Sequence, residues 1–545
     1  MPSHSISHGN RRFGIILGIG CLLVVSLAGM KMKGGILNDS FHHGEYFASL
    51  ATLLSSQYTL VPLTIHGALD YIPGLIAFHT FGPEDYFFPT WLIYRLLNVA
   101  AAILLYLLAE DFSKDRPHSL FISLAWALCA PAFVGYRDVM LLLSIYLYFS
   151  IQKQDNPLTA KVLEVCFGVV VALGLFWSFD RGITAAVSLG SACLVQLFGS
   201  RLYLSSLASF AITLLAIELV FPQASLSGYF DNLRILLETA SQWSREWKHS
   251  YGIFLAGLLA LANALAIGLL LLAMFDRKAS TNHLSNCLFF ILLSLFLFEI
   301  GSNRIDLEHI LMGLWGPLLA GLYWYLSIRE KKPGPILKAS LSLIFVALLM
   351  ASYKSRNPVF IPMAASVIIV LSHALPLART KTMSHTLAML LLVLTLSSSL
   401  LQVAKGYSDK EYVWLDYLDS PPPNPLLVTE GVRWASRELL SSGSHCVFDL
   451  ANNGVINGLT GLPACSRFTY PIYADHRYEK EMIDSMKKQR PKAIIYSSTY
   501  WSFRIDGRTM HARFPSLNDF LKNEYTQEKC HLEYCIRYLK SRNNG

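Results

Sequence analysis

Apolar residues in this chain gather in long runs rather than in the short alternating patterns of soluble strands. A helix needs about 20 mostly apolar residues to cross a bilayer, and about thirteen runs of roughly 15 to 22 residues come near that length. The run 138–152 is short, and its ends are the least defined. The pattern predicts membrane-spanning helices at approximately 13–30, 88–109, 118–136, 138–152, 162–179, 182–199, 202–221, 251–275, 284–300, 309–328, 336–353, 358–377 and 385–404.

The loop 31–87 contains two moderately apolar stretches that are too short or too interrupted to span. The stretches 45–56 and 60–81, the second broken at Pro62 and Pro73, predict helices lying along the membrane interface. The segment 222–250 predicts an amphipathic helix that contacts either the membrane or the helical bundle. Its apolar residues stand at helical spacing and are followed by tryptophans: Phe230, Leu233, Leu236, Leu237, Trp243 and Trp247.

From about residue 405 the pattern changes to shorter elements. Prolines between 421 and 425 indicate a stiff linker over 405–425. Beyond it, strand-like runs at Cys446–Leu450 and Ala493–Ser497 alternate with charged helical stretches such as Tyr478–Arg490. We therefore expect an all-α polytopic membrane bundle over 1–404 and a small C-terminal α/β domain over 426–545.

Hydrophobic residues make up 53% of the 545 residues and charged residues 15%. A soluble protein of this composition would expose large apolar patches, so the chain is a polytopic membrane protein. The first run should stay as an anchor, because Lys31 and Lys33 follow it rather than a small-residue cleavage site.

Basic residues set the orientation. An odd number of spans puts the ends of the bundle on opposite sides, and the positive-inside rule places the N-terminus in the cytoplasm and the C-terminal domain outside. The exceptions Lys31, Lys33, Lys354 and Arg356 are few. The net charge of +8 is then explained by loops that face an anionic leaflet, which removes the reason to expect nucleic acid as a partner. The inner basic residues are Arg11, Arg12, Lys114, Arg116, Lys153, Lys161, Arg201, Arg277, Lys278, Arg329, Lys331, Lys332, Arg379 and Lys381.

Four cysteines lie in the predicted outer domain and five lie in apolar runs. An even set outside the cell suggests disulfides, most simply Cys446–Cys465 and Cys530–Cys535. Four free buried thiols are the alternative, because the sequence does not show pairing.

The stretch 38–47 follows the first run and carries two carboxylates and two imidazoles, namely Asp39, Glu45, His42 and His43. The structural interpretation is that Asp39 caps a helix and the histidines are interfacial polar residues. Three further charged stretches, 136–138, 179–182 and 303–309, also stand at outer ends of spans. Each could be a local Asp–Arg pair, and we favour that for Arg137 with Asp138.

Together, however, these stretches predict a shared polar cavity. Arginine binds phosphate oxygens bidentately and a nearby carboxylate can act as a base, which suits a phosphate-bearing lipid and a hydroxyl nucleophile.

This arrangement resembles the GT-C membrane glycosyltransferases, which use polyprenyl-phosphate sugar donors. Asp39 to Glu45 resembles the D-x-x-H-x-G-E opening of a bacterial subgroup. Further elements similar to that subgroup are His66–Asp70, Asn303–His309, and the stretch Leu450–Tyr470 with Asn452, Asn453 and Gly461 to Pro463. The resemblance covers nearly the whole chain, and the order of the short motifs carries it.

The resemblance implies Asp39 as the base, with Glu45 as the next candidate. The chain lacks the paired acidic dipeptide of several GT-C subfamilies, which leaves the choice of base open. We expect no bound metal or other cofactor, and a divalent cation at His42, His43 and Glu45 is the alternative. The donor phosphate and substrate would be bound by Arg304, Asp306, His309, Asp180, Arg181, His42, His43, His66 and Arg137.

The implied reaction moves a sugar from a polyprenyl-phosphate donor to a glycan or lipid acceptor, such as lipopolysaccharide, O-antigen or another envelope glycan. It would take place on the periplasmic face of the bacterial inner membrane. The alternatives are a lipid-linked glycan flippase or transporter, and a glycan polymerase or ligase.

Overall fold

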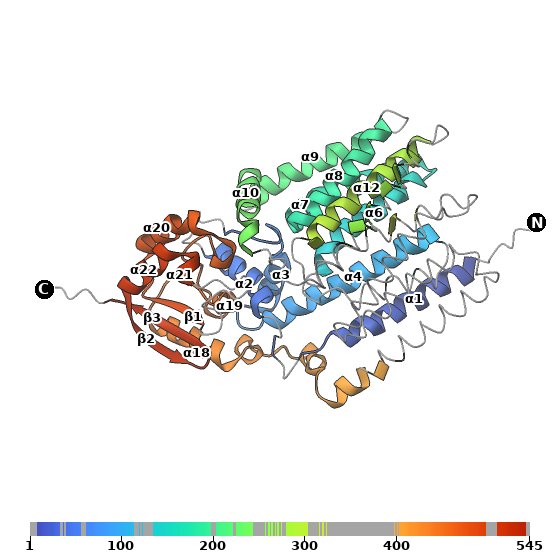
Figure 1. Cartoon of the computed structure of the whole chain (residues 1–545). Coiled ribbons are helices and arrows are strands. Elements are labelled where there is room, and N and C mark those ends of the chain that lie inside the picture. Colours follow the sequence, from blue (N-terminus) through green and yellow to red (C-terminus); the bar gives the residue numbers. More distant parts are fainter. Residues whose placement is uncertain are drawn as a thin grey trace, which may run out of the picture.

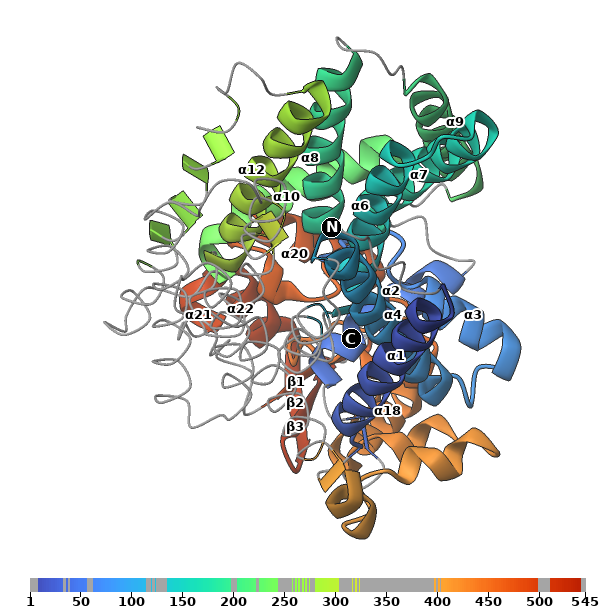
Figure 2. The same cartoon turned by 90° about the vertical axis from the view of Figure 1, so that its right-hand side faces the viewer.

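The computed structural model describes residues 8–32, 36–37, 40–55, 62–113, 135–197, 203–221, 225–243, 280–302, 403–497 and 510–540, with scattered positions at 119 and 123 and within 257–274, 316–323 and 397–401. Long apolar helices lie side by side along one direction, and they remain neighbours when the molecule is turned (Figures 1 and 2). They are α1 (His8–Gly29), α4 (Phe87–Ser113), α6 (Asp138–Gln152), α7 (Pro157–Trp177), α8 (Phe179–Leu197), α9 (Leu204–Val220) and α12 (Thr281–Ser302).

These helices confirm that the corresponding predicted runs are helical, including the short run at 138–152. Within the described ranges, α4, α7 and α12 are long and apolar enough to cross a membrane. The number of about thirteen spans stays a prediction, because the other runs lie wholly or largely outside the described residues: 118–136, 251–275, 309–328, 336–353, 358–377 and 385–404.

Aromatic side chains fill the core of the bundle between α4, α6 and α12. The ring of Phe149 packs against those of Phe112, Phe289 and Phe290, with centroids 4.8 to 5.9 Å apart. Phe149, Phe289 and Phe290 are at most 3% exposed. Such offset and edge-on ring packing adds to the apolar area buried between the helices.

The first loop forms α2 (Ser40–Leu54) and α3 (Ile72–Phe81). In α3, Ile76 and Phe81 are exposed, as an interfacial helix requires. The prediction that the first stretch also lies on the interface is wrong, because residues 43–52 of α2 are all buried. The C-terminal region covers α2, so protein surrounds residues 43–52, whereas Leu54 at the end of the helix is exposed.

Beyond residue 403 the chain forms short helices around a three-stranded antiparallel sheet of order β1-β3-β2, in which Ile495 pairs with Ile536. The elements are η4 (Val413–Leu418), η5 (Asn424–Leu427), α18 (Glu430–Ser441), α19 (Val455–Thr460), η6 (Pro471–Tyr473), η7 (His476–Tyr478), α20 (Glu479–Gln489), β1 (Ala493–Ser497), α21 (Met510–Arg513), α22 (Pro515–Glu524), β2 (Tyr525–His531) and β3 (Tyr534–Leu539).

The C-terminal predictions hold for β1 and α20. The run Cys446–Leu450 is not a strand, because it makes only isolated bridges, Val447 with Ala464 and Asp449 with Ile495. The division of the chain at residues 405 and 425 stays a prediction.

Both predicted disulfides are confirmed, Cys446–Cys465 and Cys530–Cys535. The first anchors the segment before α19, and the second joins β2 to β3 beside their turn.

The C-terminal region lies against the end of the bundle at which α1 finishes (Figure 1). There Met32 donates its backbone N–H to the Glu411 carbonyl, and Lys31 pairs with the Glu411 carboxylate at 2.6 Å. The start of α1 is therefore at the opposite end of the bundle from the sheet. The two remaining elements at this end are η2 (Gly135–Arg137) and α10 (Leu226–Trp243).

Candidate functional site

Six of the eleven residues expected at the site lie together between the helical bundle and the C-terminal region. They come from α2, from the loop before α3, and from the junctions that begin α6 and α8: His42, Glu45, His66, Arg137, Asp180 and Arg181. Four expected residues, Asp39, Arg304, Asp306 and His309, fall outside the described residues, although the expected list also contained His43, which the structure places elsewhere.

Glu45 is the buried carboxylate at the centre of this group. Its side chain is 6% exposed, and its Oε2 lies 2.6 Å from His66 Nε2. Its Oε1 accepts a hydrogen bond of 2.7 Å from the Tyr473 hydroxyl, which comes from η6 in the C-terminal region. The carboxylate is thus contacted from both halves of the molecule.

The charge states of Glu45 and His66 follow from their surroundings. Burial raises the pKa of Glu45, but the imidazoles of His66 and His42 and the Tyr473 hydroxyl outweigh burial and hold that pKa below its usual value. Burial and the charge of Arg137 lower the pKa of His66, and Glu45 offsets them only in part. The pair is therefore a carboxylate beside a neutral imidazole at neutral pH.

The loop that carries His66 is held by the junction between α7 and α8. Phe179 donates its N–H to the His66 carbonyl at 2.6 Å, and Leu69 donates to the Phe176 carbonyl at 2.9 Å. A Cβ at Gly67 would lie 2.2 Å from the Trp177 carbonyl oxygen, so only glycine permits this approach. The backbone contact fixes His66 next to Asp180 and Arg181.

The starts of α6 and α8 exchange ion pairs. Arg181 Nε donates to Asp138 Oδ1 at 2.6 Å, and its Nη1 contacts Asp180 Oδ2 at 3.0 Å. Arg137 reaches the same Asp180 oxygen at 3.5 Å. The expected local pair between Arg137 and Asp138 is therefore wrong, because Asp138 pairs across the helices with Arg181.

Arg137 keeps part of its hydrogen-bonding capacity. Its Nε is buried, and within the described part of the chain no acceptor reaches that atom. Arg137 also lies close enough to His66 and Asp70 to affect the titration of both. A guanidinium with an open donor beside a carboxylate is suited to hold a phosphate oxygen.

Asp70 is a second buried carboxyl group at the site, and it was not among the expected site residues. Burial, together with the charge of Glu45, raises its pKa well above the usual value, and Arg137 offsets this only in part. Its Oδ1 has no hydrogen-bond partner among the described residues. The surroundings thus shift the pKa values of Glu45 and Asp70 in opposite directions, a division seen where two carboxyl groups have different tasks.

Aromatic rings line the bundle side of the site. Tyr94 stacks on Tyr46 at 4.4 Å between centroids and contacts Tyr136 at 4.6 Å edge-on. Tyr136 meets Trp177 at 5.8 Å, and Trp177 Nε1 donates to the Tyr136 carbonyl. The Tyr94 hydroxyl donates to the Asp70 carbonyl. This packing fixes the backbone from which Asp70 and Arg137 project.

The C-terminal region holds α2 through its backbone. The Tyr470 hydroxyl donates to the Phe41 carbonyl at 2.7 Å and accepts from Gly454 N–H at 2.9 Å. A Cβ on Gly454 would lie 2.2 Å from the Gly44 carbonyl oxygen. Tyr473 was missed by the sequence analysis, and Tyr470 entered it only as the end of the stretch Leu450–Tyr470, because nothing near either tyrosine in the sequence indicates a contact with α2.

The structure does not assemble the alternative cation site at His42, His43 and Glu45. His43 Nδ1 is bonded to the Tyr46 hydroxyl, whereas the His42 ring stacks 6.5 Å from that of His66. Within the described ranges, the group whose ligand atoms lie close enough for a metal is Glu528, Cys530 and Cys535. Its two cysteines form a disulfide, which removes the thiolates that a metal would need.

Comparisons with known proteins gave structural similarities only. No protein-family model matches the chain, and no curated protein matches it in sequence. The chain is similar to ArnT from Cupriavidus metallidurans bound to undecaprenyl phosphate, at 12% identity and a TM-score of 0.45 over 96% of this chain and 97% of that one. The apo state of ArnT gives 0.47 over the same shares, again at 12% identity.

An Archaeoglobus fulgidus oligosaccharyltransferase in complex with Zn and sulfate is also similar, at 12% identity and a TM-score of 0.34 over 93% of this chain and 71% of that one. At these identities and TM-scores the matched structures add no argument about the ligand or reaction of the present chain.

Proposed function

We propose that the protein is a GT-C-type membrane glycosyltransferase that moves a sugar from a polyprenyl-phosphate donor to a glycan or lipid acceptor on the periplasmic face. The observation that carries the proposal is the site itself, where a buried carboxylate at Glu45 and an incompletely bonded guanidinium at Arg137 both act on the His66 imidazole. Such a transfer requires carboxylate chemistry at the acceptor hydroxyl and a cationic side chain that binds the donor phosphate.

In the proposed reaction the acceptor hydroxyl attacks the anomeric carbon of the donor sugar. The hydroxyl proton passes to a carboxylate as the acceptor oxygen bonds to the anomeric carbon. The bond between the anomeric carbon and the donor phosphate oxygen breaks, and its electron pair stays on that oxygen. Arg137, together with the predicted Arg304, would neutralise the departing polyprenyl phosphate. Holding donor and acceptor in one orientation supplies much of the remaining rate.

Asp39 remains our first candidate for the base and Glu45 the second. Asp39 directly precedes the first residue of α2, Ser40, and Glu45 lies about one and a half turns further on. The hydrogen bond from Tyr473 and the contact with His66 support a Glu45 carboxylate that is ionised and fixed in place. In this assignment Glu45 orients the site and Asp39 takes the proton.

The test uses the purified full chain in detergent with lipid-linked sugars extracted from its own cells, and mass spectrometry of the products. A transferase makes a covalent product in detergent, whereas a flippase makes none once the bilayer is removed. Asp39→Asn should lower turnover by roughly a hundredfold or more while the protein stays folded. An intact rate in Asp39→Asn together with a lost rate in Glu45→Gln would move the base to Glu45.

Comparing the surface glycolipids and lipid-linked sugars of cells with and without the protein would identify the sugar and the acceptor. A polymerase or ligase would change the length or the attachment of a whole glycan, whereas the proposed transferase changes one sugar. No covalent product in detergent, with the same lipids unchanged in cells, would contradict the proposal.

A further inference from the structure

Helix α10 (Leu226–Trp243) presents three separate stripes of side chains, each at helical spacing. One stripe is buried, one is charged, and one is apolar and exposed. Ordinary surface helices have one buried face and one polar face. An exposed apolar stripe on a helix already anchored by its other two faces therefore needs a partner of its own.

The buried stripe attaches α10 to the loop that carries His66. Asn232 Nδ2 donates to both the carbonyl and the hydroxyl of Thr64, each at 3.0 Å. The Tyr229 ring packs on Phe176 and Phe179, with centroids 5.2 and 4.9 Å apart. Since Phe179 also holds the His66 carbonyl, α10 is packed directly behind the proposed site.

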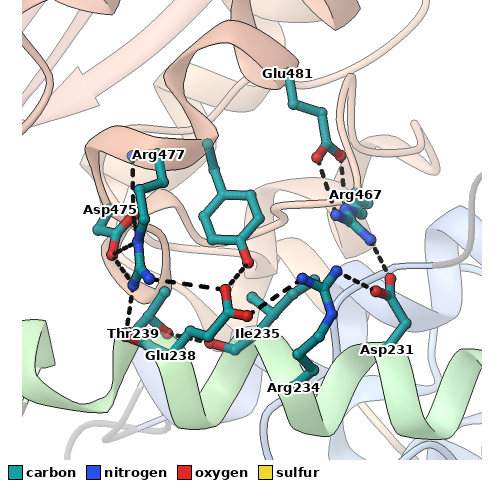
Figure 3. A network of polar contacts seen from close by, with 10 residues as sticks. Asp231, Arg234, Ile235, Glu238, Thr239, Arg467, Asp475, Arg477 and Glu481 are labelled. Carbon is teal, nitrogen blue, oxygen red and sulfur yellow. Dashed lines mark hydrogen bonds and ion pairs between the residues drawn. The ribbon is translucent and has the colours of Figure 1, made fainter.

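The charged stripe attaches α10 to the C-terminal region (Figure 3). Asp231 pairs with Arg467 at 2.6 Å, and Glu238 accepts a hydrogen bond of 2.8 Å from the Tyr478 hydroxyl. Arg477 Nη2 donates to the Glu238 carbonyl at 2.5 Å. In Figure 3 Asp231 and Glu238 on α10 face Arg467 and Arg477 of the C-terminal region.

The apolar stripe consists of Leu226, Phe230, Leu233 and Leu237, which follow one another at intervals of four, three and four residues. Phe230 is 62% exposed and Leu237 70% exposed, and Leu226 at 38% is also exposed. Leu226, Phe230 and Leu237 are thus the exposed members of the stripe, and Leu233, which is partly buried, packs against the core at its edge.

The stripe continues the outer surface of α9. Leu215, Leu219 and Val220, in the last turns of α9, are between 60% and 72% exposed. The Glu218 carboxylate accepts a hydrogen bond of 2.6 Å from the Leu226 N–H, which ties the end of α9 to the start of α10. In Figure 1, α10 turns across the direction that α9 and its neighbours share. An apolar helix of the bundle is thus followed by a helix lying across the bundle axis.

We propose that the stripe Leu226–Phe230–Leu233–Leu237 rests in the outer leaflet of the membrane that α9 crosses. An interfacial helix keeps its apolar side chains in the acyl boundary and its charged side chains in the headgroup or protein layer. The stripe begins where the exposed apolar surface of α9 ends. Lipid acyl chains that contact α9 would therefore also contact the stripe. α10 thereby joins the membrane surface to the His66 loop and to the C-terminal region.

The test places the photoreactive residue p-benzoylphenylalanine at single positions of the full chain in nanodiscs made of phosphatidylethanolamine and phosphatidylglycerol. Leu237 is the test position, and Leu215 on α9 is the positive control. The matched negative control is Leu440 on α18, which is 49% exposed on the C-terminal region. After irradiation, mass spectrometry of the digested protein identifies lipid adducts.

We expect lipid adducts at positions 237 and 215, and at least tenfold fewer at 440. Adducts at 237 no more abundant than at 440 would overturn the proposal, and so would a cross-linked dimer from position 237, which would show that a second copy of the chain covers the stripe. Phe230 gives an independent check with the same expected result. Neither position belongs to the proposed site, so failure of the glycosyltransferase assignment leaves this experiment unaffected.

Discussion

Two clusters of opposite charges occupy the end of the molecule where the bundle meets the C-terminal region, and they differ chiefly in burial. In the candidate site the Glu45 and His66 side chains are 6% and 12% exposed. In the α10 network those of Arg234, Glu238 and Arg477 are 56%, 36% and 46% exposed. Ion pairs of similar length therefore differ in their energetic effect between the two clusters.

Charges in the buried cluster lose hydration, so their protonation depends on neighbouring side chains. A buried donor without an acceptor, such as Arg137 Nε, is costly, and a bound ligand would explain it. Charges in the exposed network stay hydrated, and each such pair contributes between about 0 and 1 kcal/mol. The comparison teaches that burial, rather than the number of ion pairs, distinguishes a reactive cluster from a docking surface.

The largest expected difference is between two arginines. Arg137→Gln removes the guanidinium proposed to hold the donor phosphate, and transfer should fall by about a hundredfold, the loss typical of a charge-stabilising donor. Arg477→Gln removes an exposed guanidinium and should leave transfer within about twofold. Product formation in detergent measures both, and equal rates for the two variants would abolish the distinction between the clusters.

A second contrast concerns the backbone contact that holds the buried cluster together. Gly454→Ala places a methyl group against the Gly44 carbonyl and should cost about 1 to 3 kcal/mol of stability through overpacking. Gly20→Ala on α1 is the control, because no heavy atom lies within 4 Å of the new Cβ. Denaturation midpoints in one detergent compare them. Equal midpoints would mean that α2 and α19 do not pack as described.

The third contrast uses pH. The Tyr473 hydroxyl helps to lower the pKa of Glu45, so Tyr473→Phe should raise that pKa. Since the site needs Glu45 ionised, activity is lost as the pH falls through this pKa, and the acid limb of the rate profile should move to higher pH. At neutral pH the rate should fall by the amount that the loss of one hydrogen bond would cause, about 0.5 to 1.5 kcal/mol in activation free energy. Tyr478→Phe, which loses its bond to exposed Glu238, should leave the acid limb in place.

The smallest effect is expected in the exposed network. Arg234→Gln breaks its short-range pairs with Asp231 and Glu238 on the same helix and should lower stability only slightly, because the guanidinium is exposed. In 0.5 M NaCl the difference from the unmodified protein should shrink, because salt screens exposed charges. A larger loss that salt does not reduce would show that this network behaves like the buried cluster.

Features that depend on local pattern could be predicted from the sequence. The bounds of α6 follow from an apolar run between charged ends, and the disulfides follow from an even cysteine set in an outer segment. The convergence of Glu45, His66 and the Asp180–Arg181 step also follows, because charged residues at outer helix ends share one plane.

Features that depend on the partner could not be predicted. Nothing near Asp138 in the sequence indicates that it pairs with Arg181, and nothing near Glu45 points to Tyr473. The exclusion of α2 from the membrane interface has the same origin, since a polar helix beside a span reads as interfacial until a covering region is known. The non-strand geometry at Cys446–Leu450 reflects tertiary packing that overrides β-propensity.

The hydrogen bond from Tyr473 to Glu45 joins residues 428 positions apart, and this separation has a consequence during biosynthesis. At about 5 to 20 residues per second, roughly 20 to 90 seconds pass between the translation of Glu45 and that of Tyr473. Throughout that interval the ribosome still holds the chain, and α2 has neither its cover nor its tyrosine. Until Tyr473 is made, water is the partner that the Glu45 carboxylate requires, because an ionised carboxylate without a hydrogen-bond partner is costly to bury.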